Sequence, residues 1–487
     1  MLYYAVAIAV IFLTVFLVLP VRYKTLVALV LMTNGFDMTP DLIQGRITWD
    51  YGAILLLITG AQLLFVRNRE AGRDKYGMFV QLLIVFWLWM FIPLLWSLFV
   101  YTYPPGGTLK YSRHMLVGYL SFFIFLRLYQ VDPTAFRKVM QGLYAITFVL
   151  MTICVLQFAV RKQILFGLFR DYASVTRYLP IMLPFCLLNL WEILSKALTG
   201  EKLKIHEVIY SGLATAVLIM TFTRGLYLAA LGVVLVGVGY LMVQRRLNSR
   251  GAFATVMVFM TAIAVAGALG GLDLAASRLK SGAEILTAAP VEKFGYDADT
   301  FSGRLRLARE RIEMSAERNP LMGYGFLNED DVPQRLRNSL RYGSIIYSPD
   351  MVRAYRYGHP YVLALHSADI SWGDLVLNTG FVGLFLFLSL LIALFANSFL
   401  VRAPHRTELV HWRLACLMQT LMTLVITFES NSIVVNVQVF SFMLAGYAYC
   451  SAVRPQPTVR IASNRGLVTG IRDINENHDN HPLLQPR

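Results

Sequence analysis

The sequence predicts an all-α polytopic membrane protein with about twelve transmembrane helices. Of its 487 residues, 57% are hydrophobic and only 15% are charged, whereas soluble proteins carry about 25% charged residues. The mean hydropathy is +0.57. Apolar runs of about 20 residues recur along the chain, and a helix of that length crosses the hydrocarbon core of a bilayer. These observations predict an integral membrane protein in which one long polar segment interrupts the series of helices.

The expected membrane spans follow directly from the apolar runs. They are residues 2–20, 50–67, 78–100, 114–130, 137–160, 178–197, 205–222, 224–243, 252–270, 371–400, 408–428 and 432–452. A shorter apolar piece, Leu26 to Met32, is expected to be a thirteenth span, a re-entrant hairpin or an interfacial segment. The first run lacks a basic leading region and a small-residue cleavage site, so we expect a retained helix and not a signal peptide.

Lysine and arginine in the short loops predict the orientation of the chain. Alternate loops carry clusters of cations, and such loops face the cytoplasm in membrane proteins. The clusters also account for the formal net charge of +15 without any nucleic-acid partner. We therefore predict a multi-pass membrane protein with these loops in the cytoplasm, which in a bacterium corresponds to the inner membrane. The cations are Arg67, Arg69, Arg73, Lys75, Arg127, Arg137, Lys138, Lys196, Lys202, Lys204, Arg245, Arg246, Arg250, Arg402 and Arg406.

The chain divides into four predicted regions. Residues 1–270 form the N-terminal transmembrane helices, and residues 271–370 form a large loop domain on the periplasmic side. The C-terminal transmembrane helices follow at 371–452, and residues 453–487 form a disordered cytoplasmic tail because they lack apolar periodicity. All four cysteines lie inside apolar runs, which argues against a disulfide framework or a cysteine metal site.

The loop at 161–177 carries cations although it is predicted to face the outside. Arg161 and Arg177 are among them. Arginine forks bind phosphate groups, so these cations predict an anionic ligand. The alternative is that the loop is an ordinary exception to a statistical rule.

The loop domain contains a predicted amphipathic helix from Arg304 to Arg318, ended by Asn319-Pro320. Arg304, Arg311 and Arg318 are spaced by seven residues and so share one face. The helix either lies over the membrane surface with solvated salt bridges or contributes to a local anion site. Because acidic and basic residues are balanced in the domain, a uniformly basic surface is excluded.

Two further features of the loop domain indicate a functional site. Gly323 and Gly325 suit a tight turn, and Tyr324 between them belongs to a set of tyrosines that favours either an interfacial belt or a surface for sugar rings. His366 stands just before the chain re-enters the membrane, with Asp369 about one helical turn later. An imidazole at that boundary could act as a general base, or it could be an ordinary hydrogen-bonded interfacial histidine.

Four short motifs occur in order between about residues 200 and 400. Together they resemble the motifs of the O-antigen ligase / O-antigen polymerase (Wzy-type) family of bacterial polysaccharide enzymes, in which a large outer loop also precedes the last helices. Outside this region only the hydropathy is similar. The motifs are Thr221-Phe222-Thr223-Arg224-Gly225, Ser302-Gly303-Arg304, Asn319-Pro320-Leu321-Met322-Gly323-Tyr324-Gly325-Phe326, and His366-Ser367 ahead of Gly380-Phe381-Val382-Gly383.

The resemblance implies a GT-C-like membrane glycosyltransferase without a cofactor or metal. Its donor would be a glycan on undecaprenyl pyrophosphate, and its acceptor another glycan, with the bilayer and other polysaccharide-assembly proteins as partners. The chemistry would be metal-independent and inverting. The implied catalytic residues are His366, Asp369, Arg304 and Arg224, and the implied substrate-binding residues are Arg161, Arg177, Arg311 and Tyr324.

The histidine motif departs from the family pattern. The family places the histidine about eleven residues before the first glycine, whereas His366 precedes Gly380 by fourteen, and Asp369 occupies the expected position. The base is therefore His366 or Asp369. An acidic residue there favours a polymerase of O-antigen or exopolysaccharide repeat units over a ligase that acts on lipid A-core. A lipid-linked oligosaccharide flippase is the second alternative, and a divalent ion at Asp297 and Asp299 is the alternative to the arginines.

Overall fold

The computed structural model describes most of the membrane region and short parts of the polar loop. The chain separates into a unit from Met1 to Val453 and a tail from Arg454 to Arg487. The tail, with its predicted disorder, lies outside the described residues. The described ranges are 13–32, 45–66, 77–103, 105–132, 134–161, 183–220, 224–268, 308–309, 311–313, 315–316, 319–326, 371–400, 407–427 and 437–452.

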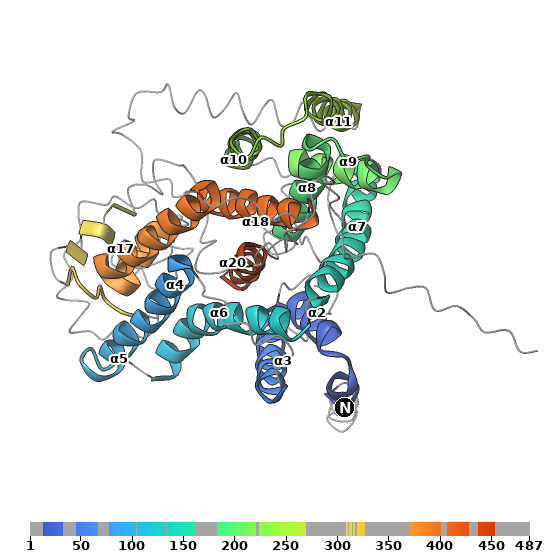
Figure 1. Cartoon of the computed structure of the whole chain (residues 1–487). Coiled ribbons are helices and arrows are strands. Elements are labelled where there is room, and N and C mark those ends of the chain that lie inside the picture. Colours follow the sequence, from blue (N-terminus) through green and yellow to red (C-terminus); the bar gives the residue numbers. More distant parts are fainter. Residues whose placement is uncertain are drawn as a thin grey trace, which may run out of the picture. The chain divides into compact units, whose positions relative to one another are not determined.

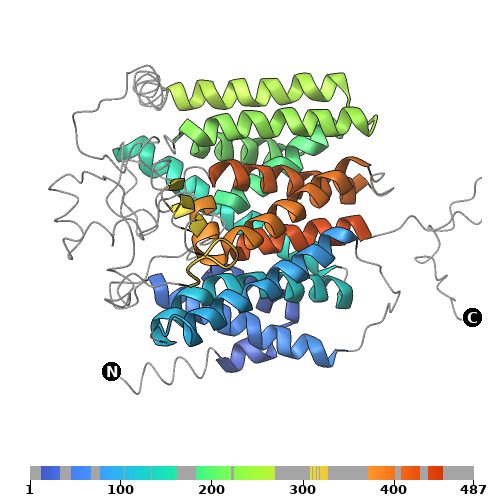
Figure 2. The same ribbon diagram turned by 90° about the vertical axis from the view of Figure 1, so that its left-hand side faces the viewer.

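The described residues form helices and turns without any strand, which confirms the predicted all-α class. Figure 2 shows the helices side by side with similar axis directions. The helices are α2 (Val21–Met32), α3 (Gly45–Phe65), α4 (Met78–Trp89), α5 (Phe91–Phe99), α6 (Pro105–Val131), α7 (Ala135–Arg161), α8 (Leu183–Leu198), α9 (Ile205–Met220), α10 (Arg224–Val243), α11 (Ser249–Ala268), α17 (Ser371–Leu400), α18 (Thr407–Ile426) and α20 (Val437–Ala452).

Five helical stretches in the described part of the chain are long and apolar enough to cross a membrane. They are Met78–Phe99, Pro105–Val131, Ala135–Leu156, Ser371–Leu400 and Thr407–Ile426, and several further apolar helices are shorter. This finding confirms a membrane protein with multiple apolar helices. The predicted total of about twelve spans stays a prediction.

The short segment near residue 30 begins earlier than the apolar run suggested. α2 starts at Val21, directly after a break at Leu19-Pro20, and packs against α3 and α7. Its Lys24 is buried, and its Nζ donates to the Leu17 carbonyl at 2.7 Å and to Gln62 Oε1 at 2.7 Å. Twelve residues of helix extend only about 18 Å. α2 is thus a short helix packed inside the bundle and does not cross the hydrocarbon by itself.

The centre of the bundle is occupied by α20, which lies between α6 and α18 (Figure 1). Its Phe440, Phe442 and Met443 are almost fully buried. Phe442 packs edge-on against Phe125 of α6, with ring centroids 5.1 Å apart. An apolar helix buried on most sides is expected for the core of a polytopic bundle, because lipid can solvate only its outer helices.

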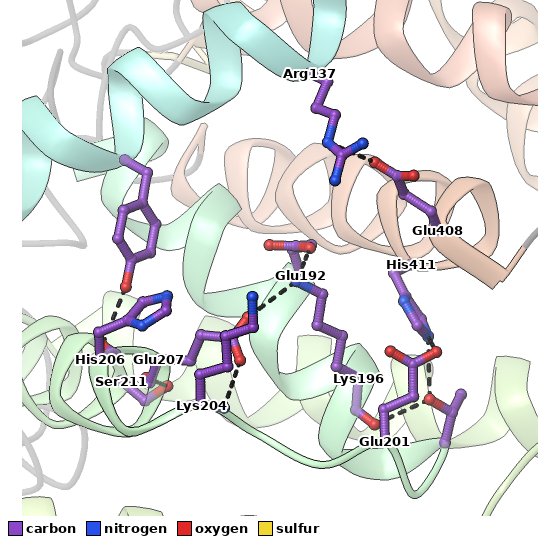
Figure 3. A network of polar contacts seen from close by, with 12 residues as sticks. Arg137, Glu192, Lys196, Glu201, Lys204, His206, Glu207, Ser211, Glu408 and His411 are labelled. Atoms are coloured by element: carbon purple, nitrogen blue, oxygen red, sulfur yellow. Dashed lines mark hydrogen bonds and ion pairs between the residues drawn. The ribbon is translucent and has the colours of Figure 1, made fainter. Parts of the chain in front are cut away.

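Side chains beside several of the loops predicted to face the cytoplasm contact one another, as drawn in Figure 3. Lys196 of α8 pairs with Glu192 of the same helix and with Glu207 of α9, the latter at 3.1 Å. Thr199 contacts His411 of α18 at 3.0 Å. Arg137 and Glu408 pair at 3.5 Å. These contacts support the predicted alternation of loops, and the side that faces the cytoplasm stays a prediction.

Candidate active site

The polar loop is the predicted loop domain at 271–370, and its Gly-x-Gly turn is formed by Gly323, Tyr324 and Gly325. This turn docks into a break in α17. Gly380 has φ 69° and ψ −175°, which are not helical values. In an unbroken helix the N–H of Phe381 would donate to the Leu377 carbonyl. Here Phe381 donates to the Pro320 carbonyl at 2.8 Å, and the Leu377 carbonyl accepts from the N–H of Tyr324 at 2.7 Å. The turn therefore supplies both partners that the broken helix lacks.

Glycine is required on both sides of this contact. Gly323 has φ 64°, and a Cβ there would lie 2.6 Å from the Val376 carbonyl oxygen. A Cβ at Gly380 would lie 2.6 Å from the Met322 backbone nitrogen. A positive φ is costly for residues with a side chain, and the close approach of the two backbones leaves no room for one. The glycines of the motif thus explain how two backbones meet.

The end of the turn is held by α5. Ser97 Oγ accepts from the N–H of Phe326 at 2.9 Å and donates to the Pro93 carbonyl at 2.7 Å. Phe326 is fully buried, and Gly325 lies against Ser97. One hydroxyl thus satisfies a buried backbone donor of the loop and fixes the distance of the loop from α5.

Three tyrosines pack beside the turn. The Tyr101 ring stacks on Tyr103, with centroids 5.3 Å apart, and on Tyr324, with centroids 6.2 Å apart. Asn319 Nδ2 donates to the Tyr101 hydroxyl at 3.1 Å. Burial, and to a smaller extent the neighbouring Tyr101 and Tyr324, raises the pKa of Tyr103, so its hydroxyl stays protonated. Only 2% of Tyr324 is exposed, which favours a packing role over direct contact with a sugar.

The described residues between 308 and 316 are helical and amphipathic. Ala308, Arg311 and Ser315 are buried, whereas Arg309 is exposed and pairs with Glu313 at 2.7 Å. The burial of Arg311 shows which face of the predicted helix turns inward. The sequence left open whether this helix is a solvated surface helix. That alternative agrees with the exposure of Arg309 but not with the burial of Arg311.

Arg311 forms a buried ion pair with Asp374, in the first turn of α17. The exposed fraction is 0% for Arg311 and 2% for Asp374. A Cβ placed on Gly373 would lie 3.0 Å from the Ala308 Cα, so the loop helix packs directly on the start of α17. That start is also fixed by the N–H of Ser371, which donates to the Thr427 carbonyl at 3.0 Å.

Sequence reasoning missed several residues of this region. Asp374 is a carboxylate inside a predicted apolar span, and such residues usually have a functional or structural partner. That signal was present in the sequence. Ser97 and Tyr101 gave no comparable signal, because a serine in an apolar helix and an interfacial tyrosine are both common.

The remaining predicted site residues are only partly described. Arg224 is the first residue of α10, as its motif predicted, and Arg161 is the last residue of α7. The structure describes the backbone but not the side chain of each. Arg177, Arg304, His366 and Asp369 lie outside the described residues, as do Asp297 and Asp299 of the alternative metal site. Their roles stay predictions.

The comparison with protein families identifies the region around this site. Residues 209–388 match the family described as O-antigen ligase. The matched segment runs from α9 into the second half of α17 and contains all four motifs that suggested the resemblance, which it confirms. Arg161 and Arg177 precede the segment. A search of curated proteins finds no match to the chain.

Proposed function

We propose that this protein is a membrane glycosyltransferase that moves a glycan from undecaprenyl pyrophosphate to a saccharide acceptor at the periplasmic face of the bacterial inner membrane. One observation carries the proposal: the Gly-x-Gly turn exchanges backbone hydrogen bonds with the break in α17, inside the segment that matches O-antigen ligases. The docked turn holds the polar loop against the helix that directly follows His366 and Asp369. A site formed by loop and membrane helices suits a lipid-linked donor and a water-soluble acceptor.

The proposed reaction is a single displacement at the anomeric carbon. His366 or Asp369 removes the proton from the acceptor hydroxyl. The acceptor oxygen forms the new bond to the anomeric carbon as the bond to the pyrophosphate oxygen breaks, and undecaprenyl pyrophosphate leaves with the electron pair. Attack from the face opposite the leaving group inverts the configuration at that carbon.

The leaving pyrophosphate gains negative charge that must be stabilised. We assign this role to Arg304 and Arg224, because arginine forks form charge-assisted hydrogen bonds with phosphate oxygens. Arg224 begins α10, where the helix dipole adds to the positive potential. Arg161, at the end of α7, and Arg177 are assigned as further donor-binding residues. The chain then needs no metal ion for the transfer.

Polymerisation of O-antigen or exopolysaccharide repeat units is the activity that we favour. Asp369 occupies the position of the family histidine, which supports a polymerase. Ligation of O-antigen to lipid A-core is the alternative, and a flippase is the second one. The flippase is less well supported, because the buried charges of α17 and the loop pair with each other at Arg311 and Asp374 and do not line a pathway.

The test uses purified full-length protein in proteoliposomes. The substrate is lipid-linked repeat units, which are extracted from a strain that lacks the gene for this protein. A polymerase extends them into a ladder without further acceptor. A ligase produces a single product only when lipid A-core is added, and a flippase transfers no sugar. The proposal would be disproved if no sugar were transferred either between lipid-linked repeat units or to added lipid A-core.

A further inference from the structure

We infer that Asp374 is a positioning residue, which acts through its ion pair with Arg311 to hold the proposed base and the proposed phosphate-binding arginine in one site. This inference rests on the proposed function. It adds a residue that the motifs do not contain and gives Arg311 a role within the protein in place of the substrate contact expected from the sequence.

The burial of the pair is the first argument. The exposed fraction of the side chain is 1% for Arg311 and 3% for Asp374. Removing two charges from water costs several kcal/mol per ion, and apolar replacements of such pairs are often equally or more stable. Stability alone is therefore a weak reason for the pair. In some proteins a buried polar or ionic group instead serves to fix one register between two surfaces, and we assign that role to this pair.

The position of each partner in the chain is the second argument. Asp374 follows Asp369 by five residues, a length that spans about 18 Å at most. Arg311 follows Arg304 by seven residues, or about 10 Å along the helix predicted from the sequence. The ion pair therefore joins the segment that carries the proposed base to the segment that carries the proposed arginine.

The third argument is that the contact is reinforced on both sides of the pair. Ala308 packs on Gly373, and the N–H of Tyr324 bonds to Leu377. The backbone bonds fix the turn at the break in α17, whereas Ala308 and Gly373 are small residues whose contact does not by itself fix the rotation of the segment around Arg311. The charge pair fixes that rotation. A displacement of only about 1 Å at a reaction centre can cost about 100-fold in rate.

A cysteine pair measures the register without any reaction. The Cβ atoms of Ala308 and a residue built at Gly373 lie 3.2 Å apart, a few tenths of an ångström shorter than the roughly 3.5–4.5 Å of disulfides. In membrane vesicles, Ala308→Cys/Gly373→Cys should cross-link rapidly with copper phenanthroline. Adding Asp374→Asn should slow cross-linking at least about tenfold. The exposed Ala316 provides the control pair, Ala316→Cys/Gly373→Cys, which should not cross-link. Unchanged cross-linking in the Asp374→Asn variant would overturn the inference.

The disulfide also tests whether the Arg311–Asp374 ion pair positions the site or takes part in the reaction itself. Arg311→Gln and the isosteric Asp374→Asn should each lower kcat about 100-fold and leave KM nearly unchanged. Oxidation of the cysteine pair in either background should restore kcat to within about tenfold of the parent, and reduction should remove the gain. Full kcat in both variants without the disulfide, or no rescue with it, contradicts a positioning role.

The two experiments separate this inference from the proposed function. If the parent protein transfers no sugar, the proposed function fails, while the cross-linking result still reports the register. If Arg311→Gln fails to accumulate in the membrane, Asp374→Asn carries both measurements, because it keeps the side-chain volume and removes only the charge.

Discussion

The carbonyl of Leu377 accepts its hydrogen bond from Tyr324 of the polar loop, at 2.7 Å, and not from Phe381 of its own helix. A break in a membrane helix must be compensated, because lipid offers no hydrogen-bond partners. The loop provides this compensation, and it can do so only in one position. The break in α17 and the Gly-x-Gly turn are thus two halves of one structural element.

The first prediction concerns the glycines of this element. Gly380→Ala and Gly323→Ala should each separate the turn from α17, because the positive φ and the close backbone contact both exclude a Cβ. We expect a loss of roughly 2–4 kcal/mol in stability and at least tenfold lower transfer activity. Thermal unfolding in detergent and the ladder assay measure the two effects.

The matched control is Gly239→Ala in α10. A Cβ at Gly239 meets no atom within 4 Å, so this variant should be as stable as the parent or slightly more stable. Equal stability of Gly380→Ala and Gly239→Ala would contradict the docking that we describe.

The second prediction concerns Ser97. Ser97→Ala removes the acceptor for the buried N–H of Phe326, and an unsatisfied buried donor costs about 1–3 kcal/mol. The midpoint of thermal unfolding should fall accordingly. Thr261→Ala is the control, because the exposed Thr261 hydroxyl bonds to the Met257 carbonyl of its own helix. A shift in Ser97→Ala no larger than that in Thr261→Ala would argue against the contact.

The local sequence pattern predicted most helices of this fold but not the contacts between segments that are distant in the sequence. Apolar runs predict helices because a membrane segment must satisfy its own backbone. The seven-residue spacing of Arg304, Arg311 and Arg318 predicted a shared face, and the structure buries Arg311. The partner of Arg311 could not be predicted, because Asp374 is 63 residues away and nothing local links the two. The same holds for Gly380, whose break depends on a turn more than fifty residues earlier.

The third prediction compares two arginines of the loop helix. Arg304→Ala should lower transfer at least about 100-fold, because the leaving pyrophosphate loses a charge-assisted partner. Arg309→Ala should keep nearly full activity, since Arg309 is exposed and paired only with Glu313 in the described part of the helix. The rate of ladder formation is the measurement. Similar rates for both variants would remove Arg304 from the proposed site.

The fourth prediction uses pH to identify the base. A general base works only when deprotonated, so the rate rises with pH through its pKa. An imidazole ordinarily has a higher pKa than a carboxyl group, so the rise lies at higher pH if His366 is the base than if Asp369 is. If His366 is the base, His366→Gln should abolish the rise of the rate with pH. If Asp369 is the base, Asp369→Asn should abolish it. A rise that persists unchanged in both variants would exclude both residues.

The last prediction is that chelation does not affect the reaction. Two ways exist to stabilise a departing pyrophosphate, a divalent ion or fixed cations. The proposed site uses arginines, so dialysis against EDTA should leave the initial rate of ladder formation unchanged, and added Mg²⁺ or Mn²⁺ should not raise it. Asp297→Asn/Asp299→Asn should likewise retain activity if these carboxylates hold no metal. Loss of activity in EDTA that Mg²⁺ restores, together with inactivity of the double variant, would favour the metal and reduce the arginines to donor binding.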